Sequence, residues 1–139
     1  MSYYRYSNAS YHRPSFLGGF RFFPPVIRYL LIGNVAVFLF MMFVGIFRLN
    51  GTSLGDILNL SLPLYPLGQG FYPWQLFTYM FMHGGLMHLA FNMFALWMFG
   101  MELENTWGSR QFLLYYFLCG VGAGLSTLLI GPLFGPAGP

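Results

Sequence analysis

Three long apolar runs constrain this chain more than any other feature of its sequence. The first follows Arg28 and continues for about 19 residues without a charge, enough for a helix to cross a hydrocarbon layer of roughly 30 Å. The other two occupy residues 85–103 and 112–131. We therefore predict an all-α membrane protein with three transmembrane helices, at about 26–49, 85–103 and 112–131.

The composition also favours the bilayer as the main partner of this chain. Of its 139 residues, 57% are hydrophobic and only 6% are charged, whereas about a quarter are charged in a soluble domain. The net charge of +3 could suit nucleic acid, but most of the basic residues precede the first apolar run. They are Arg5, Arg13, Arg21 and Arg28. Positive charge there favours a cytoplasmic N-terminus, so we expect contact with lipid and no nucleic acid.

The segments outside the three runs differ in character. Residues 1–25 are polar and aromatic, and we expect a largely disordered cytoplasmic tail. Residues 50–75 are apolar but interrupted by prolines and glycines, so they cannot cross lipid as a helix and we predict an interfacial loop. We expect a polar turn from Glu104 to Arg110. Residues 132–139 are rich in Pro and Gly, and we interpret them as a truncated loop.

Polar side chains within the second run are the candidate functional residues. His88 and Asn92 are four positions apart, so they share one helix face. Polar groups at membrane depth usually face a bundle interior or a wet cavity. Two donors on one face could stabilise an oxyanion, or they could hydrogen-bond neighbouring helices and hold the bundle together. Residue chemistry alone leaves both open. His83 is assigned to the junction before the helix.

No cofactor or metal is expected. Two histidines without a carboxylate or thiol on the same face make a poor ligand set. In the third run, Gly120 and Gly124 form a G-x-x-x-G motif, which is typical of a helix-packing face. Ser126 lacks the following glycine of a nucleophile motif, and a serine in a membrane helix usually bonds its own backbone four residues back. We predict that it is not a nucleophile.

From about Trp74 to Leu125 the sequence resembles the rhomboid family. The resemblance is carried by Trp74, by the H-x-x-x-x-H-x-x-x-N spacing of His83, His88 and Asn92, and by Gly100, Glu104 and Gly108-Ser109. Gln75 stands where the family often has an arginine. The resemblance implies a rhomboid-like membrane domain over 26–131. It also implies a complete bundle of six or more spans that cleaves membrane-anchored proteins with a Ser–His dyad.

The resemblance implies roles for individual residues. The positions matching His88 and Asn92 help to build the oxyanion hole of the family. Those matching His83, Trp74 and Glu104 are implied to give structural support. The family carries its nucleophilic serine in a G-x-S-G at the start of the fourth helix and its general base in the sixth. We therefore expect an incomplete rhomboid that does not hydrolyse peptides by itself.

Two functions remain open at this point. One is an intramembrane serine endopeptidase, represented by a chain without nucleophile and base. The other is a rhomboid-like pseudoprotease that binds transmembrane clients without cleaving them. A channel or transporter ranks last, because it would need ionisable residues along a path across the membrane. We expect transmembrane protein substrates or clients as partners, and a bacterial inner (plasma) membrane as the location, with the N-terminus cytoplasmic.

Overall fold

Three helices of equal length dominate the structure, a computed structural model that describes residues 21–49 and 51–131. They are α1 (Pro25–Ile46), α4 (Leu86–Trp107) and α5 (Ser109–Ile130), each of 22 residues. At 1.5 Å per residue each is about 33 Å long, and each is apolar enough to cross a membrane. The predicted all-α membrane fold is thus confirmed. The tail up to residue 20 and the loop 132–139 lie outside the described residues.

The predicted polar turn between the second and third spans is wrong. α4 continues through Glu104 to Trp107, and α5 begins at Ser109, so only Gly108 separates the two helices. Gly108 has φ +84°, a conformation that glycine adopts without the steric cost of a Cβ atom. The polar residues of this stretch mark inter-helix contacts rather than a loop, as described below for Glu104.

The first span ends three residues earlier than predicted, because the chain leaves α1 for a small hairpin. Strand β1 (Arg48–Leu49) pairs antiparallel with β2 (Thr52–Ser53), with Arg48 opposite Ser53. Helix α2 (Leu54–Asn59) follows, and Ser53 and Asp56 form a capping box at its start. The predicted interfacial loop therefore begins with local structure, before its part rich in proline and glycine.

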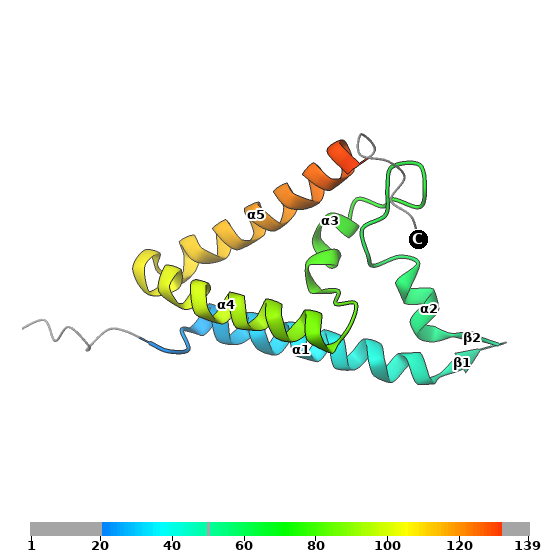
Figure 1. Ribbon diagram of the computed structural model, residues 1–139, viewed down its shortest axis with the longest axis horizontal. Helices are drawn as coiled ribbons and strands as arrows, with labels where there is room; N and C mark the ends of the chain where they lie inside the picture. The colour runs from blue at the N-terminus through cyan, green and yellow to red at the C-terminus, as the bar shows by residue number, and fades with distance from the viewer. Residues whose placement is uncertain (1–20, 50, 132–139) are drawn as a thin grey trace, which may run out of the picture.

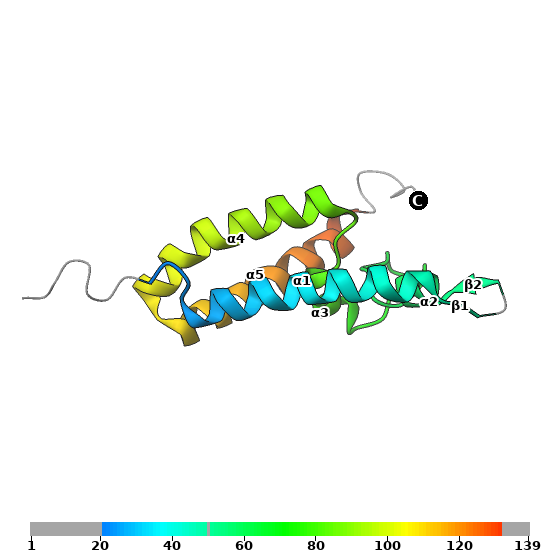
Figure 2. The same cartoon turned by 90° about the horizontal axis from the view of Figure 1, so that it is seen from below.

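A short helical segment fills the space between the long helices. It consists of α3 (Gln75–Thr78) and the 3₁₀ turn η1 (Tyr79–Phe81). Figure 1 shows that α5 diverges from α4 after the turn that joins them and that α3 lies beside α5. Figure 2 shows α1 and α4 as two separate helices that lie next to each other. α3 contacts α5, while η1 contacts α1. After the predicted loop of residues 50–75, the chain thus enters the bundle through α3 and η1 before α4 begins.

The best-buried apolar cluster lies where α1, α4 and α5 come together. It contains Ile27, Leu30 and Phe112. A side chain on Gly100 would overlap Ile27, so the glycine lets α1 and α4 approach closely. Most of the remaining apolar surface is exposed, including Phe91 and Phe94 on α4. Such a surface suits hydrocarbon rather than water as the surrounding solvent.

Candidate functional site

The two predicted histidines meet at the start of α4. The ring centroids of His83 and His88 are 5.4 Å apart, with the rings edge to face. The Gly84 N–H donates to Nδ1 of His88 at 3.3 Å. When Nδ1 accepts in this way, a neutral imidazole carries its proton on Nε2. His88 is exposed, so its Nε2–H remains available as a donor.

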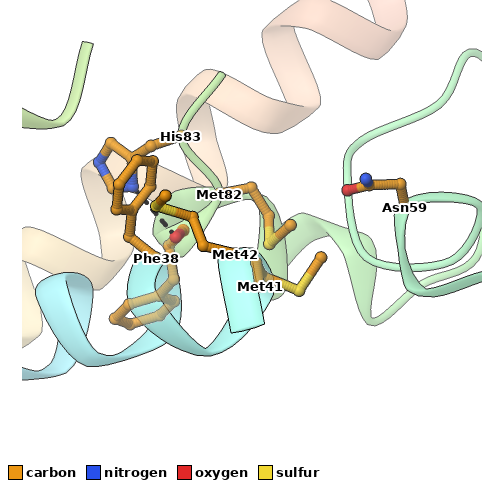
Figure 3. A pocket seen from close by; sticks show the side chains of 7 residues that line it. Phe38, Met41, Met42, Asn59, Met82 and His83 are labelled. Carbon is orange, nitrogen blue, oxygen red and sulfur yellow. Dashed lines mark hydrogen bonds between the residues drawn. The ribbon is translucent and has the colours of Figure 1, made fainter. Parts of the chain in front are cut away.

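His83 has a different environment, which suits its predicted place in the junction. Its Nδ1 lies 3.1 Å from the carbonyl oxygen of Phe81, which can only accept, so the proton lies on Nδ1. Burial lowers the pKa of His83, which favours the neutral ring. The residue lines a pocket of about 200 Å³ between α1 and the chain before α4, and Figure 3 shows it at the opposite end from Asn59. The remaining lining residues are Phe38, Met41, Met42, Phe81 and Met82.

Asn92 lies one turn beyond His88 on α4. Its side chain is exposed and has no hydrogen-bond partner among the described residues. It borders a cavity of about 240 Å³ between α1, η1, α4 and α5. His88 is not among the residues that line this cavity, although it shares a helix face with Asn92. The polar residues that line it with Asn92 are Asn34, Tyr79, His83 and Tyr116.

The serines of the described region are all engaged away from histidine. Ser126 Oγ donates to the Gly122 carbonyl oxygen at 2.8 Å, four residues back, which is the bond expected of a serine in a membrane helix. The other serines that the structure describes are Ser53, Ser61 and Ser109, which bond Asp56, Leu58 and Glu104 respectively. Within residues 21–49 and 51–131, therefore, no serine is paired with an imidazole base.

Glu104 ties the end of α4 to the beginning of α1. Its side chain is 3% exposed. Its two carboxylate oxygens accept from the backbone N–H groups of Val26 and Ile27, at 3.0 and 2.8 Å. Ser109 Oγ adds a third bond at 2.6 Å. In the first turn of α1, Pro25 has no N–H and the Arg28 N–H donates to the Pro24 carbonyl oxygen. Glu104 therefore supplies the acceptors for the two N–H groups of that turn that would otherwise have none.

Trp74 and Gln75 hold the loop that precedes α3. Trp74 stacks on Tyr72 with ring centroids 4.5 Å apart, and its Nε1–H donates to the Ser61 carbonyl oxygen at 3.0 Å. Gln75 is completely buried. Its Oε1 accepts from the Tyr65 N–H, while its Nε2 donates to the carbonyl oxygens of Ser61 and Gly70. The loop backbone is thus organised around an amide side chain.

Gly120 and Gly124 form a packing face, but its partner is η1 and α3 rather than another span. A Cβ atom on Gly120 would overlap Met80, and one on Gly124 would come 3.0 Å from the Tyr79 ring. The Tyr79 hydroxyl also donates to the Gly120 carbonyl oxygen. The small residues therefore allow the segment between loop and α4 to pack against α5.

Sequence reasoning missed three polar residues that the structure brings together or buries. These are Gln75, Asn34 and Tyr116. Asn34 is an uncharged polar side chain within the first apolar run, so the reasoning applied to Asn92 would also have identified it. Gln75 was distinguished only as the residue that stands where the family often has an arginine, and this gave no indication of its buried hydrogen bonds.

Comparisons with known proteins find members of one family. The family model of the rhomboid domain matches residues 71–138, which include Gln75, the histidines, Asn92 and Glu104. Rhomboid protease GluP of Bacillus subtilis is 39% identical over 59 residues, which cover 42% of this chain. RHOMBOID-like protein 4 of Arabidopsis thaliana is 28% identical over 131 residues, and human Rhomboid-related protein 3 is 32% identical over 101. No solved structure matches the chain significantly.

The aligned regions are only part of these relatives. The aligned region covers 12% of the length of GluP, 33% of the Arabidopsis protein and 25% of the human protein. Of this chain, the alignment with the Arabidopsis protein covers 77% and that with the human protein covers 67%. The domain match and these relatives indicate the same family, and the three apolar helices indicate a membrane location. The chain is an integral membrane protein, its residues 71–138 match the rhomboid domain, and it is similar to members of the rhomboid family.

Proposed function

We propose that this chain supplies the oxyanion-binding part of an intramembrane serine endopeptidase that acts on membrane-anchored proteins. The observation that carries the proposal is on the first turns of α4. The Gly84 N–H fixes the tautomer of His88 so that its Nε2–H is a free donor, and the Asn92 carboxamide one turn later has no partner among the described residues. Free donors on one face are what a developing oxyanion requires. Relatives named as proteases support the reaction class.

The proposal includes the location and partners of the chain. Three arginines precede α1 and Arg28 lies in its first turn, whereas only Arg48 lies in the connection that follows α1, which supports a cytoplasmic N-terminus. We infer a bacterial inner membrane as the location. A substrate would be a transmembrane helix or its flanking segment, since the exposed surface of α4 is apolar around His88 and Asn92, as at Phe91.

A chimera tests the proposed role of Asn92. Residues 74–131 would replace the aligned segment of GluP, and reaction with a fluorophosphonate would first establish that the chimera carries a reactive serine. We expect Asn92→Ala to lower kcat for a transmembrane substrate about 10²-fold, because one oxyanion donor is lost. The measurement is turnover of the substrate in detergent micelles.

A matched exposed residue on the same helix provides the control. Met87→Ala truncates a side chain that is 65% exposed and carries no hydrogen-bond donor, so kcat should change less than about twofold. If Asn92→Ala and Met87→Ala have equal effects, Asn92 acts in packing and its proposed role is wrong.

The alternative is a rhomboid-like protein that binds transmembrane clients without cleavage. It is favoured by the engagement of all described serines away from histidine. Oxyanion donors have no covalent step to assist unless a base activates a nucleophile.

The isolated 139-residue chain is expected to be inactive under both readings. Purified in detergent, it should neither react with a fluorophosphonate nor cleave a transmembrane substrate, because no described serine is bonded to an imidazole. Labelling at any serine, located by mass spectrometry, would contradict this expectation. A photo-crosslinker at position 91 would separately report whether the chain binds a transmembrane helix.

A further inference from the structure

Methionines gather in the pocket that His83 lines near the C-terminal end of α1. Three of its seven lining residues are Met41, Met42 and Met82. Methionine makes up only 9 of the 139 residues of the chain, so this grouping departs far from the average composition. Met41 and Met42 belong to α1, whereas Met82 directly follows η1. Figure 3 shows these side chains around one pocket, with Asn59 set apart from them.

The pocket offers sulfur atoms as ligands and no anionic group. Thioether sulfur is a soft ligand that suits Cu(I). None of the residues that line the pocket is acidic, so a divalent ion would keep both of its charges uncompensated in an apolar surrounding. A soft monovalent ion combines a smaller desolvation cost with a better ligand match. The expectation from the sequence that no metal binds concerned imidazole, carboxylate and thiol ligands, and thioethers are a separate class.

The pocket has room for an ion and walls that can adapt to it. Its volume is about 200 Å³, and the methionine side chain has three rotatable bonds, so the sulfur atoms can turn towards a common ion. Met42 is 59% exposed, which leaves the edge of the pocket open. The Nδ1–H of His83 is held by the Phe81 carbonyl oxygen, so its Nε2 carries the lone pair. Imidazoles that bind metals usually have such a backbone partner on the other ring nitrogen.

Two other cavities of the bundle do not bring three sulfur atoms together. The cavity of about 350 Å³ between α4 and α5 is lined by Met80 and Cys119 among mainly apolar residues. The cavity of about 240 Å³ beside Asn92 is lined by Met80 and Met93. In both of them Met80 occupies the space beside Gly120, so its side chain serves the packing of η1 on α5. The pocket beside His83 therefore differs from these cavities in its chemistry.

We propose that the pocket lined by Met41, Met42 and Met82 binds one Cu(I) ion through its thioether sulfurs, with His83 as the nitrogen donor. The ion would join α1 to the chain that leads into α4, because its ligands come from both. Binding to the folded chain alone would therefore also stabilise the bundle. The inference goes beyond the proposed function, since it requires neither an oxyanion nor a nucleophile.

Methyl carbon-13 NMR of the methionines in detergent micelles tests this inference. The full chain would carry Cys119→Ser, because the exposed thiol is itself a ligand for Cu(I). Cu(I) would be added without oxygen in competition with bicinchoninate. We expect one equivalent to bind and to shift the methyl resonances of the three pocket methionines. Those of Met87 and Met98, which are 65% and 38% exposed on α4 and do not line the pocket, should stay in place.

Leucine substitutions remove the sulfur atoms with little change in volume. The triple variant Met41→Leu, Met42→Leu, Met82→Leu should weaken Cu(I) binding more than about 100-fold, since removal of groups that only orient ligands already costs about 10–100-fold. The matched triple variant Met87→Leu, Met98→Leu, Met101→Leu removes as many thioethers from α4 and should change the affinity less than about twofold. Circular dichroism would establish that both variants are helical.

Three results would overturn the proposal. One is the absence of Cu(I) binding to the Cys119→Ser chain. Another is an equal loss of affinity in the two triple variants, which would mean that thioethers bind Cu(I) wherever they lie. The third is a shift of all methionine resonances alike in the chain with its methionines intact, and this result decides the matter even if the pocket variant does not fold.

Discussion

Glu104→Ala is expected to lower the free energy of unfolding by about 3–5 kcal/mol, a large part of the stability of a small bundle. The carboxylate receives three hydrogen bonds while 3% exposed, so its removal leaves the N–H groups of Val26 and Ile27 without a partner in an apolar surrounding. It also removes a negative charge from the N-terminus of α1, where the helix dipole favours one. Tryptophan fluorescence during unfolding in mixed SDS micelles would measure the change.

Glu102 offers a matched control one half-turn away. It lies on α4 and is exposed, and its carboxylate has no hydrogen-bond partner among the described residues. Glu102→Ala should change the unfolding free energy by less than about 0.5 kcal/mol. Glu104→Gln keeps one acceptor oxygen and should fall between the two. If Glu104→Ala is as mild as Glu102→Ala, the carboxylate does not hold α1 to α4.

Other contacts around Glu104 show why the loss should affect the whole bundle. The Asn105 side chain donates to the Arg21 carbonyl oxygen and accepts from the Arg21 N–H, at 2.8 and 2.9 Å. Trp97 Nε1 donates to the Phe22 carbonyl oxygen at 3.1 Å. The start of α1 is therefore held to α4 by hydrogen bonds between side chains and backbone. These bonds matter because the hydrophobic effect contributes little to the association of helices in a membrane.

The membrane helices were predictable because their signal is local. A run of apolar residues long enough for the bilayer must be helical, since lipid satisfies no backbone group. The polar turn at Glu104 was predicted wrongly because a local pattern of polar residues was taken to indicate exposure to water, whereas Glu104 is buried. Three donors around one carboxylate are brought together by α1, α4 and α5, and no window of sequence displays that convergence.

The candidate site was only partly predictable, because some of its features are set by local spacing and others by contacts between distant segments. The spacing of His88 and Asn92 fixes their common helix face, whereas the tautomer of His88 depends on the Gly84 N–H, which only the folded junction places. Gly120 and Gly124 indicated a packing face, but not that η1 and α3 would occupy it. Partners from distant segments are set by tertiary contacts rather than by local pattern.

Gln75→Leu is expected to release the loop before α3, with a cost of about 3 kcal/mol for three lost hydrogen bonds. The substitution keeps an apolar side chain of similar size but leaves the Tyr65 N–H and the carbonyl oxygens of Ser61 and Gly70 without their amide partner. Such a cost corresponds to roughly 10²-fold faster hydrogen exchange at the Tyr65 amide, if that amide exchanges through local opening. Mass-spectrometric exchange of the peptide covering 61–72 would measure it.

Gln69→Leu is the matched control, because Gln69 belongs to the same loop and is exposed, and its side chain has no hydrogen-bond partner among the described residues. Exchange in that variant should stay within about twofold of the unmodified chain. Gln75→Glu should be at least as disruptive as the leucine, since a carboxylate would face two carbonyl oxygens that can only accept. Unchanged protection at Tyr65 in both Gln75 variants would show that Trp74, through its own bond to Ser61, holds the loop without the amide.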